Sequence, residues 1–330
     1  MNFENMNSMY FIGIGGIGMS GIARYWRSRG KQISGYDKTP TTLTDELQHE
    51  GMKIVFEDDV ANLPTQIDLV VYTPAIPADH KQLNYLRAQG KTILKRSELL
   101  EELTKNLFTI AVAGTHGKTT TTTLIAHILK HSGYDCTAFL GGISVNYQTN
   151  FLIGKNQVVV VEADEFDRSF LHLHPDIAVI TSCDADHLDI YGNELSVQQS
   201  FIEFADKVKP GGTLILKKNI SVENHLQQKE PVTYSLHNTS ADYFSYNNKL
   251  IDELYAFDVM TPFGDNSPLQ LGIPGEHNVE NAVAAIAVAS QLMIDEDAIA
   301  ESLQTFRGVK RRFEYLIRRD GLTFIDDYAH

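Results

Sequence analysis

The sequence predicts an α/β protein with two successive domains, each built on a parallel sheet. Strand-like and helix-like segments alternate along the first hundred residues, which is typical of a parallel sheet covered by helices on both faces. Glycine-rich turns follow two apolar strands, at residues 13–18 and 114–117, and each turn leads into a helical pattern. Between residues 231 and 271, short strands with turn signals predict a small antiparallel addition to the second domain.

Length and composition describe an ordinary soluble protein and exclude several classes of function. The chain has 330 residues, which suggests two or three domains. No apolar run approaches the ~20 residues that span a bilayer, and residues 1–8 lack the apolar core of a signal peptide. The two cysteines, Cys136 and Cys183, make no disulfide framework, so we expect a protein of the reducing cytoplasm. The formal net charge of −14 disfavours nucleic acids and membrane surfaces as partners.

The elements of the first domain follow one another in a regular alternation. Strands are predicted at 10–14, 32–36, 53–56, 68–72 and 92–94. The first helix begins after residue 18, because Met19, Ile22, Ala23 and Trp26 lie on one helical face. Further helices are predicted at 43–50, 79–89 and 98–104.

The second domain is predicted to begin at Leu107. Its strands include 108–113, 157–161, 176–181 and 213–216, and the second of these is a near-continuous apolar run, typical of a strand buried on both faces. Helices are predicted at 279–292 and 296–305, and a pair of strands at 314–318 and 322–325.

The segment 108–120 has the pattern of a phosphate-binding loop. An apolar strand leads into a glycine-rich turn, and a helix opens on Lys118 and Thr119, so backbone N–H groups and the helix dipole favour an anion there. Lys118 is placed to contact the β- and γ-phosphates, and the Thr119 hydroxyl to hold Mg²⁺. Val112 stands where the common pattern has glycine, so the loop is a shortened variant unlike that of an ordinary GTPase or kinase.

The first glycine-rich turn matches the dinucleotide fingerprint G-x-G-x-x-G. It occupies residues 13–18, and Asp37 follows at the end of the next strand, where an acid can bind a ribose hydroxyl. Physically the pattern requires only a diphosphate at a helix N-terminus and a ribose nearby. Both NAD and a UDP-sugar meet that requirement, and the residues alone leave the choice open.

Two acidic clusters follow neighbouring strands and are expected at the ligand-binding edge of the sheet. The first contains Glu162, Asp164, Glu165 and Asp167, and the second contains Asp184, Asp186, His187 and Asp189. Carboxylates beside a phosphate loop are suited to Mg²⁺, which prefers hard oxygen ligands. His187 could bind a second divalent ion or donate a hydrogen bond to phosphate, and a solvated acidic turn remains the alternative for the first cluster.

A further polar group opens the predicted helix near residue 279. Asn278 and Asn281 share a helix face beside His277, and amide side chains are well suited to the edge of a purine. Helix capping would account for Asn278 but not for all three residues.

Taken together, these motifs resemble the Mur ligases of bacterial peptidoglycan synthesis. The matching segments occur in the family's order, at 13–21, 114–120, 162–165, 186–187 and 275–278. Within the family, the details are most similar to members that join L-alanine to UDP-N-acetylmuramate. Members that recycle whole tripeptides rank second, because their first glycine loop and the segment after their acidic cluster differ.

The resemblance implies three domains that bind UDP-sugar, ATP and amino acid in turn. Residues 1–106 would form the Rossmann-like UDP-sugar domain, and residues 107–325 the central ATP-binding domain of P-loop ATPase type. Residues 326–330 resemble the hinge where the third domain starts, so the chain is expected to lack that domain. Such a chain would bind its ligands and catalyse poorly.

The resemblance also implies a mechanism and its site residues. The muramyl carboxylate attacks the γ-phosphate of ATP, and the L-alanine amine then displaces phosphate from the acyl phosphate. The catalytic residues would be Lys118, Glu162 and His187, and the Mg²⁺ ligands Thr119, Glu162 and His187. The ATP-binding residues would be Gly114, Thr115, His116, Gly117, Lys118, Thr119, Thr120, His277, Asn278, Asn281 and Arg312. The residues that bind the UDP-sugar would be Gly15, Gly16, Ile17, Gly18, Asp37, Thr73, Pro74, Ala75, Ile76 and Arg96.

Two other classes of function compete with a ligase. An NAD-dependent oxidoreductase would use the first glycine loop and Asp37, but it leaves Lys118 and the acidic clusters without a role. A nucleotide-gated switch would use the phosphate loop without ligation, and the placement of Glu162 and His187 favours chemistry over switching.

Overall fold

The computed structural model describes residues 3–184, 191, 193–226, 229–319 and 321–328. Its contacts divide the chain into two compact units, Met1–Asn106 and Leu107–His330. Each unit has its own buried apolar cluster.

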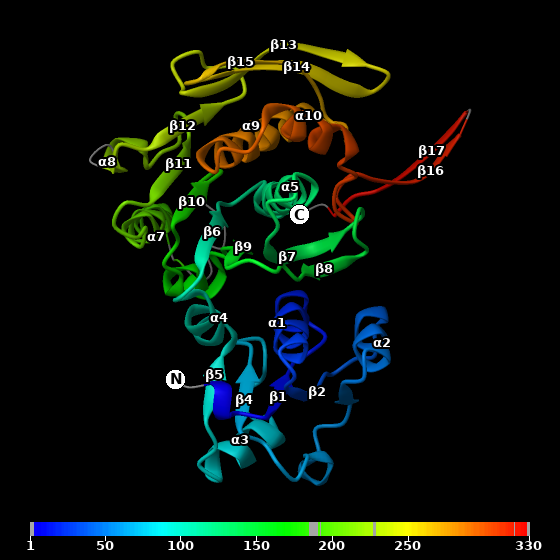
Figure 1. Ribbon diagram of the computed structural model, residues 1–330. Coiled ribbons are helices and arrows are strands. Elements are labelled where there is room, and N and C mark those ends of the chain that lie inside the picture. Colours follow the sequence, from blue (N-terminus) through cyan, green and yellow to red (C-terminus); the bar gives the residue numbers. More distant parts are fainter. Residues whose placement is uncertain (1–2, 185–190, 192, 227–228, 320, 329–330) are drawn as a thin grey trace. The chain divides into compact units, whose positions relative to one another are not determined.

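The first unit is a five-stranded parallel sheet connected by helices (Figure 1). Its strands are β1 (Ser8–Ile12), β2 (Gln32–Tyr36), β3 (Lys53–Val55), β4 (Leu69–Tyr72) and β5 (Ile93–Lys95). They lie in the order β3-β2-β1-β4-β5, and each neighbouring pair is parallel. The connecting elements are α1 (Ile17–Ser28), α2 (Thr42–His49), α3 (Lys81–Ala88), α4 (Arg96–Thr104) and the short turns η1 (Phe3–Asn5) and η2 (Val60–Asn62). The predicted parallel-sheet fold is confirmed.

Local sequence explains these elements. All five residues of β1 are buried, as expected for the central strand of a sheet covered on both faces. Helix α2 begins with a capping box, in which the Thr44 N–H donates to Thr41 Oγ1 and the Thr41 N–H donates to Thr44 Oγ1. The positions of α1 that face inward include Met19, Ile22 and Trp26, in agreement with the predicted helical face.

In the described part of the second unit, ten strands form one mixed sheet in the order β15-β14-β13-β12-β11-β10-β6-β9-β7-β8. The central strands are parallel: β6 (Phe108–Ala113), β7 (Thr137–Ser144), β9 (Val158–Glu162), β10 (Ile177–Ile180), β11 (Thr213–Lys217) and β12 (Val232–Ser235). β8 (Thr149–Leu152) pairs antiparallel with β7 at one edge. At the other edge, β13 (Tyr243–Ile251) runs parallel to β12, and β14 (Leu254–Thr261) and β15 (Gly264–Gln270) continue antiparallel.

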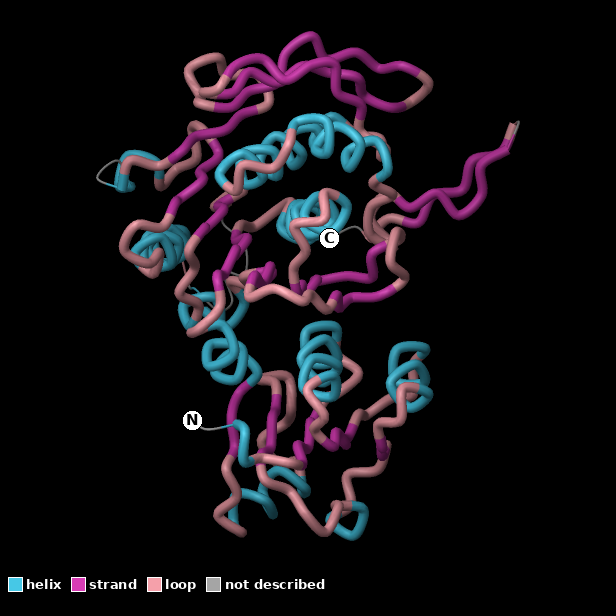
Figure 2. The backbone as a smooth tube through the Cα atoms, viewed as in Figure 1, coloured by secondary structure: helices cyan, strands magenta, loops and turns pink. Residues whose placement is uncertain are grey.

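Helices cover both faces of this sheet (Figures 1 and 2). Figure 1 shows α5 (Lys118–His131), α9 (Glu276–Gln291) and α10 (Glu296–Thr305) on one side and α7 (Glu194–Asp206) on the other. Smaller elements are η3 (Phe166–His172) and α8 (Glu223–Leu226). The chain continues into a two-stranded hairpin, β16 (Glu314–Arg319) and β17 (Leu322–Asp326), that projects from the second unit. The main core joins α5 and α9 to the sheet, and almost every residue of α9 from Asn278 to Ala289 is buried.

Several features differ in detail from the sequence prediction, and one of them is α7, which is not predicted. The antiparallel strands β13–β15 occur where an addition is predicted, but they extend the main sheet through β12 and form no separate sheet. Strands β7 and β8 are not predicted, since Gly141 and Gly142 interrupt the apolar pattern of β7.

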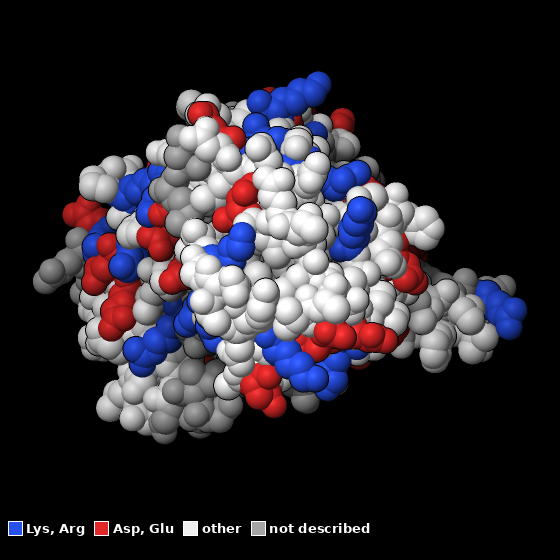
Figure 3. Space-filling view, turned by 90° about the horizontal axis from the view of Figure 1, so that it is seen from below, with Lys and Arg blue, Asp and Glu red and all other residues white. Residues whose placement is uncertain are grey.

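On the face shown in Figure 3, acidic and basic side chains are interspersed. Within the described ranges, no helix has both the length and the apolar character needed to cross a membrane.

Candidate active site

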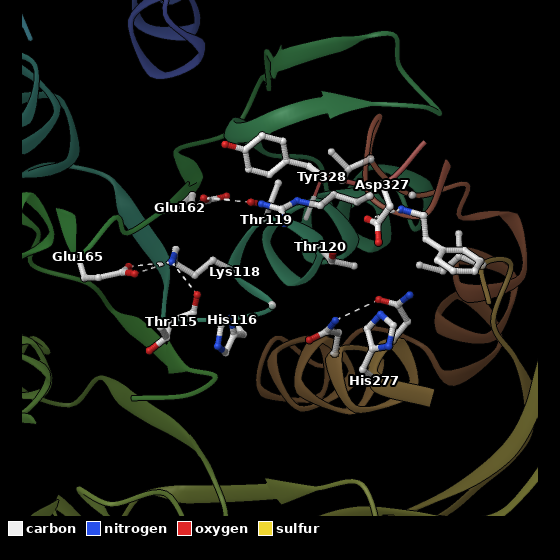
Figure 4. Close-up of a pocket in the computed structure, with 18 residues that line it drawn as sticks. Thr115, His116, Lys118, Thr119, Thr120, Glu162, Glu165, His277, Asp327 and Tyr328 are labelled. Carbon is white, nitrogen blue, oxygen red and sulfur yellow. Dashed lines mark hydrogen bonds and ion pairs between the residues drawn. The ribbon is translucent and has the colours of Figure 1, made fainter. Parts of the chain in front are cut away.

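A cavity of about 380 Å³ lies beside the carboxyl ends of β6 and β9 in the second unit (Figure 4). Five segments form its walls: the turn after β6 with the start of α5, the end of β9, the start of α9, the segment after α10, and the base of the β16–β17 hairpin. The lining residues are Thr115, His116, Gly117, Lys118, Thr119, Thr120, Glu162, Glu165, Ile273, His277, Asn278, Asn281, Gly308, Val309, Arg312, Phe313, Asp327 and Tyr328. All the ATP-binding residues predicted from the sequence, except Gly114, therefore line this one cavity.

The turn between β6 and α5 is held in place by backbone geometry and by the strand beside it. Gly114 has a φ of 139°, and a Cβ there would lie 2.1 Å from Thr181 Oγ1. Gly117 precedes α5 with a φ of 79°, and a Cβ there would lie 2.6 Å from Asn281 Oδ1. Because Gly117 provides no side-chain cap, the N–H groups of the first turn of α5 remain suited to an anion.

The loop is also hydrogen-bonded to the residues that follow β10. The His116 N–H donates to Ser182 Oγ over 2.8 Å, and the Thr115 N–H donates to the Ser182 carbonyl over 3.3 Å. The Thr115 hydroxyl donates to the carbonyl of Asp184. Sequence reasoning missed Ser182, which fixes the shape of the phosphate loop from a neighbouring strand end.

The Lys118 ammonium turns back onto its own loop and onto Glu165. Its Nζ lies 2.9 Å from Glu165 Oε1 and 2.8 Å from Glu165 Oε2. It also donates to the Gly114 carbonyl over 2.5 Å and lies 3.4 Å from the Thr115 carbonyl. Glu165 is only 2% exposed, so this ion pair is enclosed by protein.

Glu162 presents a carboxylate with one satisfied and one unsatisfied oxygen. The Thr119 hydroxyl donates to Glu162 Oε1 over 3.1 Å, whereas Oε2 is buried without a hydrogen-bond partner. Burial raises the pKa of the Glu162 carboxyl, and the positive charge of Lys118 opposes that rise. A buried oxygen without a partner is costly unless a cation or a proton satisfies it.

These residues fit a Mg²⁺ ion. Mg²⁺ takes oxygen ligands, commonly one or two from protein with phosphates and waters completing an octahedron. Glu162 Oε2 and the Thr119 hydroxyl supply two such oxygens beside the phosphate loop. Among the residues that the structure describes, no group of three or more His, Cys, Asp or Glu side chains is arranged to hold a metal.

The second acidic cluster falls almost wholly outside the described residues. This is true of the predicted metal ligand His187 and of Asp186 and Asp189. Asp184 is described, and its Oδ2 lies 3.9 Å from His116 Nε2 with both side chains exposed.

His277, Asn278 and Asn281 of α9 line the cavity, and the two asparagine side chains are hydrogen-bonded to other parts of the protein. The Asn281 amide donates to Asn278 Oδ1 over 3.2 Å, and Asn281 Oδ1 accepts from the Thr121 hydroxyl of α5. The Asn278 amide donates to the Pro274 carbonyl. Capping by Asn278 is therefore not its role, because the N-cap is Gly275, which makes no side-chain cap.

The base of the β16–β17 hairpin completes the wall. Arg312, predicted from sequence, lines the cavity with its guanidinium 5.6 Å from the centre of the Tyr328 ring. The Phe313 N–H donates to Asp327 Oδ1, and the Tyr328 N–H donates to the Arg311 carbonyl. Phe313, Asp327 and Tyr328 were missed, because nothing in their spacing shows that a hairpin returns to the cavity.

In the first unit, the predicted UDP residues gather at the carboxyl edge of the sheet. The turn after β1 meets the residues that follow β4, since a Cβ on Gly13 would lie 3.0 Å from Thr73 Cγ2 and 3.3 Å from Ile76 Cδ1. A Cβ on Gly18 would lie 2.7 Å from a guanidinium nitrogen of Arg96, which follows β5. The predicted residues of this edge are Gly15, Gly16, Ile17, Gly18, Asp37, Thr73, Pro74, Ala75, Ile76 and Arg96.

Asp37 lies beside the glycine loop at the end of β2, as the dinucleotide fingerprint predicts, and it is hydrogen-bonded there. Its Oδ2 accepts from the Gly15 N–H over 2.7 Å, and its Oδ1 accepts from the Thr39 N–H over 3.3 Å. The carboxylate thus holds the glycine loop against the end of β2.

Comparisons with known proteins agree with this geometry. Residues 8–107 match the family model of the Mur ligase family, catalytic domain, and residues 112–289 match the Mur ligase middle domain. The UDP-N-acetylmuramate–L-alanine ligase of Flavobacterium johnsoniae is 49% identical over 100% of this chain and 73% of its own length. The crystal structure of the UDP-N-acetylmuramate-alanine ligase of Thermotoga maritima has a TM-score of 0.89 and 32% identity, over 99% of this chain and 75% of that one.

A third relative is a murein peptide ligase from Psychrobacter arcticus. Its structure has a TM-score of 0.83 and 26% identity, over 99% of this chain and 73% of that one. The matched domain models and the identity to the Flavobacterium ligase, with the phosphate loop and its acidic neighbours in one cavity, settle the question of family: this chain belongs to the Mur ligases.

Proposed function

We propose that this chain serves the ATP-dependent ligation of L-alanine to UDP-N-acetylmuramate in peptidoglycan precursor synthesis. The observation that carries the proposal is the second-unit cavity, where a phosphate loop, Lys118 and the unsatisfied Oε2 of Glu162 lie together. An NAD-dependent oxidoreductase has no use for such a cavity.

The choice of L-alanine over a tripeptide rests on similarity. The L-alanine ligase of Thermotoga maritima is nearer in both identity and TM-score than the murein peptide ligase of Psychrobacter arcticus. Tripeptide ligation is the second candidate.

We assign ATP to the cavity of the second unit. Its phosphates would lie on the loop formed by Gly114, Thr115, His116, Gly117, Lys118, Thr119 and Thr120. Thr119 and Glu162 would hold Mg²⁺, with His187 as a further metal ligand. His277, Asn278 and Asn281 would lie near the adenosine, and Arg312 near the phosphates or the substrate.

We assign UDP-N-acetylmuramate to residues 1–106. The turn of Gly15–Gly18 would accept the diphosphate at the start of α1, where Gly16 is an N-cap without a side-chain cap. Arg96 lies against Gly18 and would add positive charge there. Thr73–Ile76 and Asp37 would contact the rest of the UDP group, and Asp37 also holds the loop in shape.

The chemistry assigned to this chain is mainly the control of charge. Attack by the muramyl carboxylate on the γ-phosphate brings together groups of like charge, so positioning and neutralisation dominate the barrier. Lys118 and the backbone N–H groups of α5 would stabilise charge on the phosphate oxygens. Mg²⁺ would supply Lewis-acid polarisation of the same oxygens, held by Glu162 and Thr119.

Calorimetric titration of this chain with UDP-N-acetylmuramate, with NAD⁺ in parallel, tests the proposal. We expect saturable binding of the UDP-sugar and none of NAD⁺. The replacement Arg96→Ala should weaken binding of the UDP-sugar by roughly ten- to a hundredfold, because a charge-assisted hydrogen bond contributes about 1.5–3 kcal/mol. Lys81→Ala removes an exposed positive charge from the same unit and should leave the affinity unchanged. Binding of NAD⁺ in place of the UDP-sugar would refute the ligase assignment.

A further inference from the structure

The N–H donors of the Lys118 ammonium already have acceptors within the protein. An ammonium carries three N–H donors. Three acceptors already take hydrogen bonds from Lys118 Nζ: Glu165 Oε1 at 2.9 Å and the Gly114 and Thr115 carbonyls at 2.5 and 3.4 Å. Glu165 Oε2 lies 2.8 Å away as a further ion-pair contact. A phosphate oxygen can therefore bind this ammonium only by displacing one of these acceptors or by sharing a donor with it.

Glu165 is the strongest of these competitors. It carries a full negative charge, whereas the two carbonyls are neutral dipoles, so Coulomb attraction to the ammonium is strongest for the carboxylate. Its side chain is 3% exposed and that of Lys118 is 14% exposed, so water screens the pair weakly. Figure 4 shows the Lys118 ammonium directed toward Glu165.

The main chain of Glu165 is itself fixed. The Tyr191 hydroxyl donates to the Glu165 carbonyl over 2.6 Å, and the Arg168 N–H donates to the same carbonyl over 3.0 Å. The backbone that carries the carboxylate is thus held at the cavity, whereas the Lys118 ammonium stands on a flexible four-carbon chain. Glu162, three residues earlier, faces Thr119 instead, so the two carboxylates have separate partners.

We propose that Glu165 is a positioning residue that retains Lys118 in the nucleotide-free chain and yields it to the β- and γ-phosphates of the nucleotide. This inference rests on the assignment of ATP to the cavity. Part of the binding free energy of the triphosphate is then used to separate an ion pair. The affinity for phosphates is lowered accordingly, while the affinity for the nucleoside is not.

The first arm of the test needs no nucleotide. Trace acetylation of the 330-residue chain with acetic anhydride, read by mass spectrometry, measures how well each lysine amine is covered, with exposed Lys81 as the internal reference. In Glu165→Gln, acetylation of Lys118 should rise several-fold. Asp164→Asn removes the same charge one residue away, at a position that does not line the cavity, and should leave Lys118 unchanged. An unchanged rate of Lys118 acetylation in Glu165→Gln would overturn the proposal that Glu165 retains Lys118.

The second arm measures binding of adenosine, ATP and inorganic tripolyphosphate by calorimetry in EDTA. Glu165→Gln should increase the affinity for ATP and for tripolyphosphate by on the order of tenfold and leave the affinity for adenosine unchanged. The tightening should be smaller in a Lys118→Met background, where no ion pair has to be separated. Equal tightening in both backgrounds would show direct repulsion by Glu165 and overturn the proposal, as would weaker ATP binding in Glu165→Gln.

The two arms separate this inference from the proposed function. If the wild-type chain binds neither ATP nor tripolyphosphate, the assignment of ATP to the cavity fails, and release of Lys118 to a nucleotide fails with it. Retention of Lys118 by Glu165 is still decided by acetylation alone.

Discussion

Two carboxylates three residues apart, Glu162 and Glu165, illustrate how surroundings set the role of a side chain. Glu165 lies against the Lys118 ammonium, whereas Glu162 has a hydroxyl on one oxygen and nothing on the other. Spacing alone suggests one acidic cluster with one role. The structure divides it into a counterion for the lysine and a carboxylate with one buried oxygen that has no partner, which suits the proposed Mg²⁺.

A buried histidine gives a prediction at the same scale. His127 of α5 is 4% exposed and is hydrogen-bonded to the Tyr147 and Thr305 hydroxyls. Burial, with the nearby charges of His131 and Arg307, lowers the pKa of His127 from 6.5 to about 4. Because the folded state binds this proton less readily than the unfolded state, the stability from neutral His127 is complete above pH 6.5. It is lost as the pH falls toward 4.

We expect the chain to lose about 2 kcal/mol of unfolding free energy through this group between pH 7.5 and pH 5. His127→Gln should reduce the loss by about that amount, as measured by urea unfolding followed by circular dichroism at both pH values. His225→Gln, at an exposed histidine of α8, should retain the wild-type dependence on pH. Identical pH dependence in His127→Gln and wild type would contradict the prediction.

At the scale of elements, the cavity depends on a strand that contributes no side chain to its lining. A Cβ on Gly141 of β7 would lie 2.2 Å from Glu162 Oε2 and 2.4 Å from Oε1. A Cβ on Gly142 would lie 2.5 Å from Val309 Cγ1. The two glycines therefore let β7 pass directly beside the carboxylate and beside the segment that follows α10.

Gly141→Ala should displace the Glu162 carboxylate. We expect a destabilisation of about 1–3 kcal/mol, typical of overpacking, together with a loss of Mg²⁺-dependent ATP binding, measured by calorimetry with and without Mg²⁺. Gly133→Ala adds a methyl at an open position with a φ of 77°, so it costs stability through backbone strain alone. It should keep Mg²⁺-dependent binding, and a similar loss in both variants would point to general destabilisation.

The same strand shows where sequence-based prediction stops. The strands that carry the phosphate loop and Glu162 are apolar over four or five successive residues, and they were predicted within one or two residues of their observed bounds. β7 was missed because paired glycines are typical of a turn. In the structure Gly141 leaves room for the Glu162 side chain of β9, a contact that the sequence does not show. Likewise Tyr328 and Asp327 reach the cavity through a hairpin, and only the three-dimensional path of the chain shows that.

At the scale of the whole molecule, each unit contains a strand that leads through a glycine-rich turn into a helix, from β1 to α1 in the first unit and from β6 to α5 in the second. Each unit has its own core, so each is expected to respond to its own ligand. Differential scanning calorimetry should resolve two transitions. UDP-N-acetylmuramate should raise the midpoint temperature of one transition, and Mg²⁺-ATP that of the other. At a hundred times its Kd, each ligand should add about 2.7 kcal/mol to the unfolding free energy of its unit. A single transition that both ligands raise equally would contradict two independently stabilised units.

The hydrogen bond between the Gly15 N–H and Asp37 has a consequence for protein engineering. In dinucleotide enzymes the acid after the second strand contacts the ribose, and an arginine nearby accommodates a 2′-phosphate instead. Here that acid supports the turn from which the diphosphate would be bound. Replacing it with arginine would remove an acceptor from the Gly15 amide and is expected to loosen the turn, so the exchange would disturb the diphosphate site along with the ribose site.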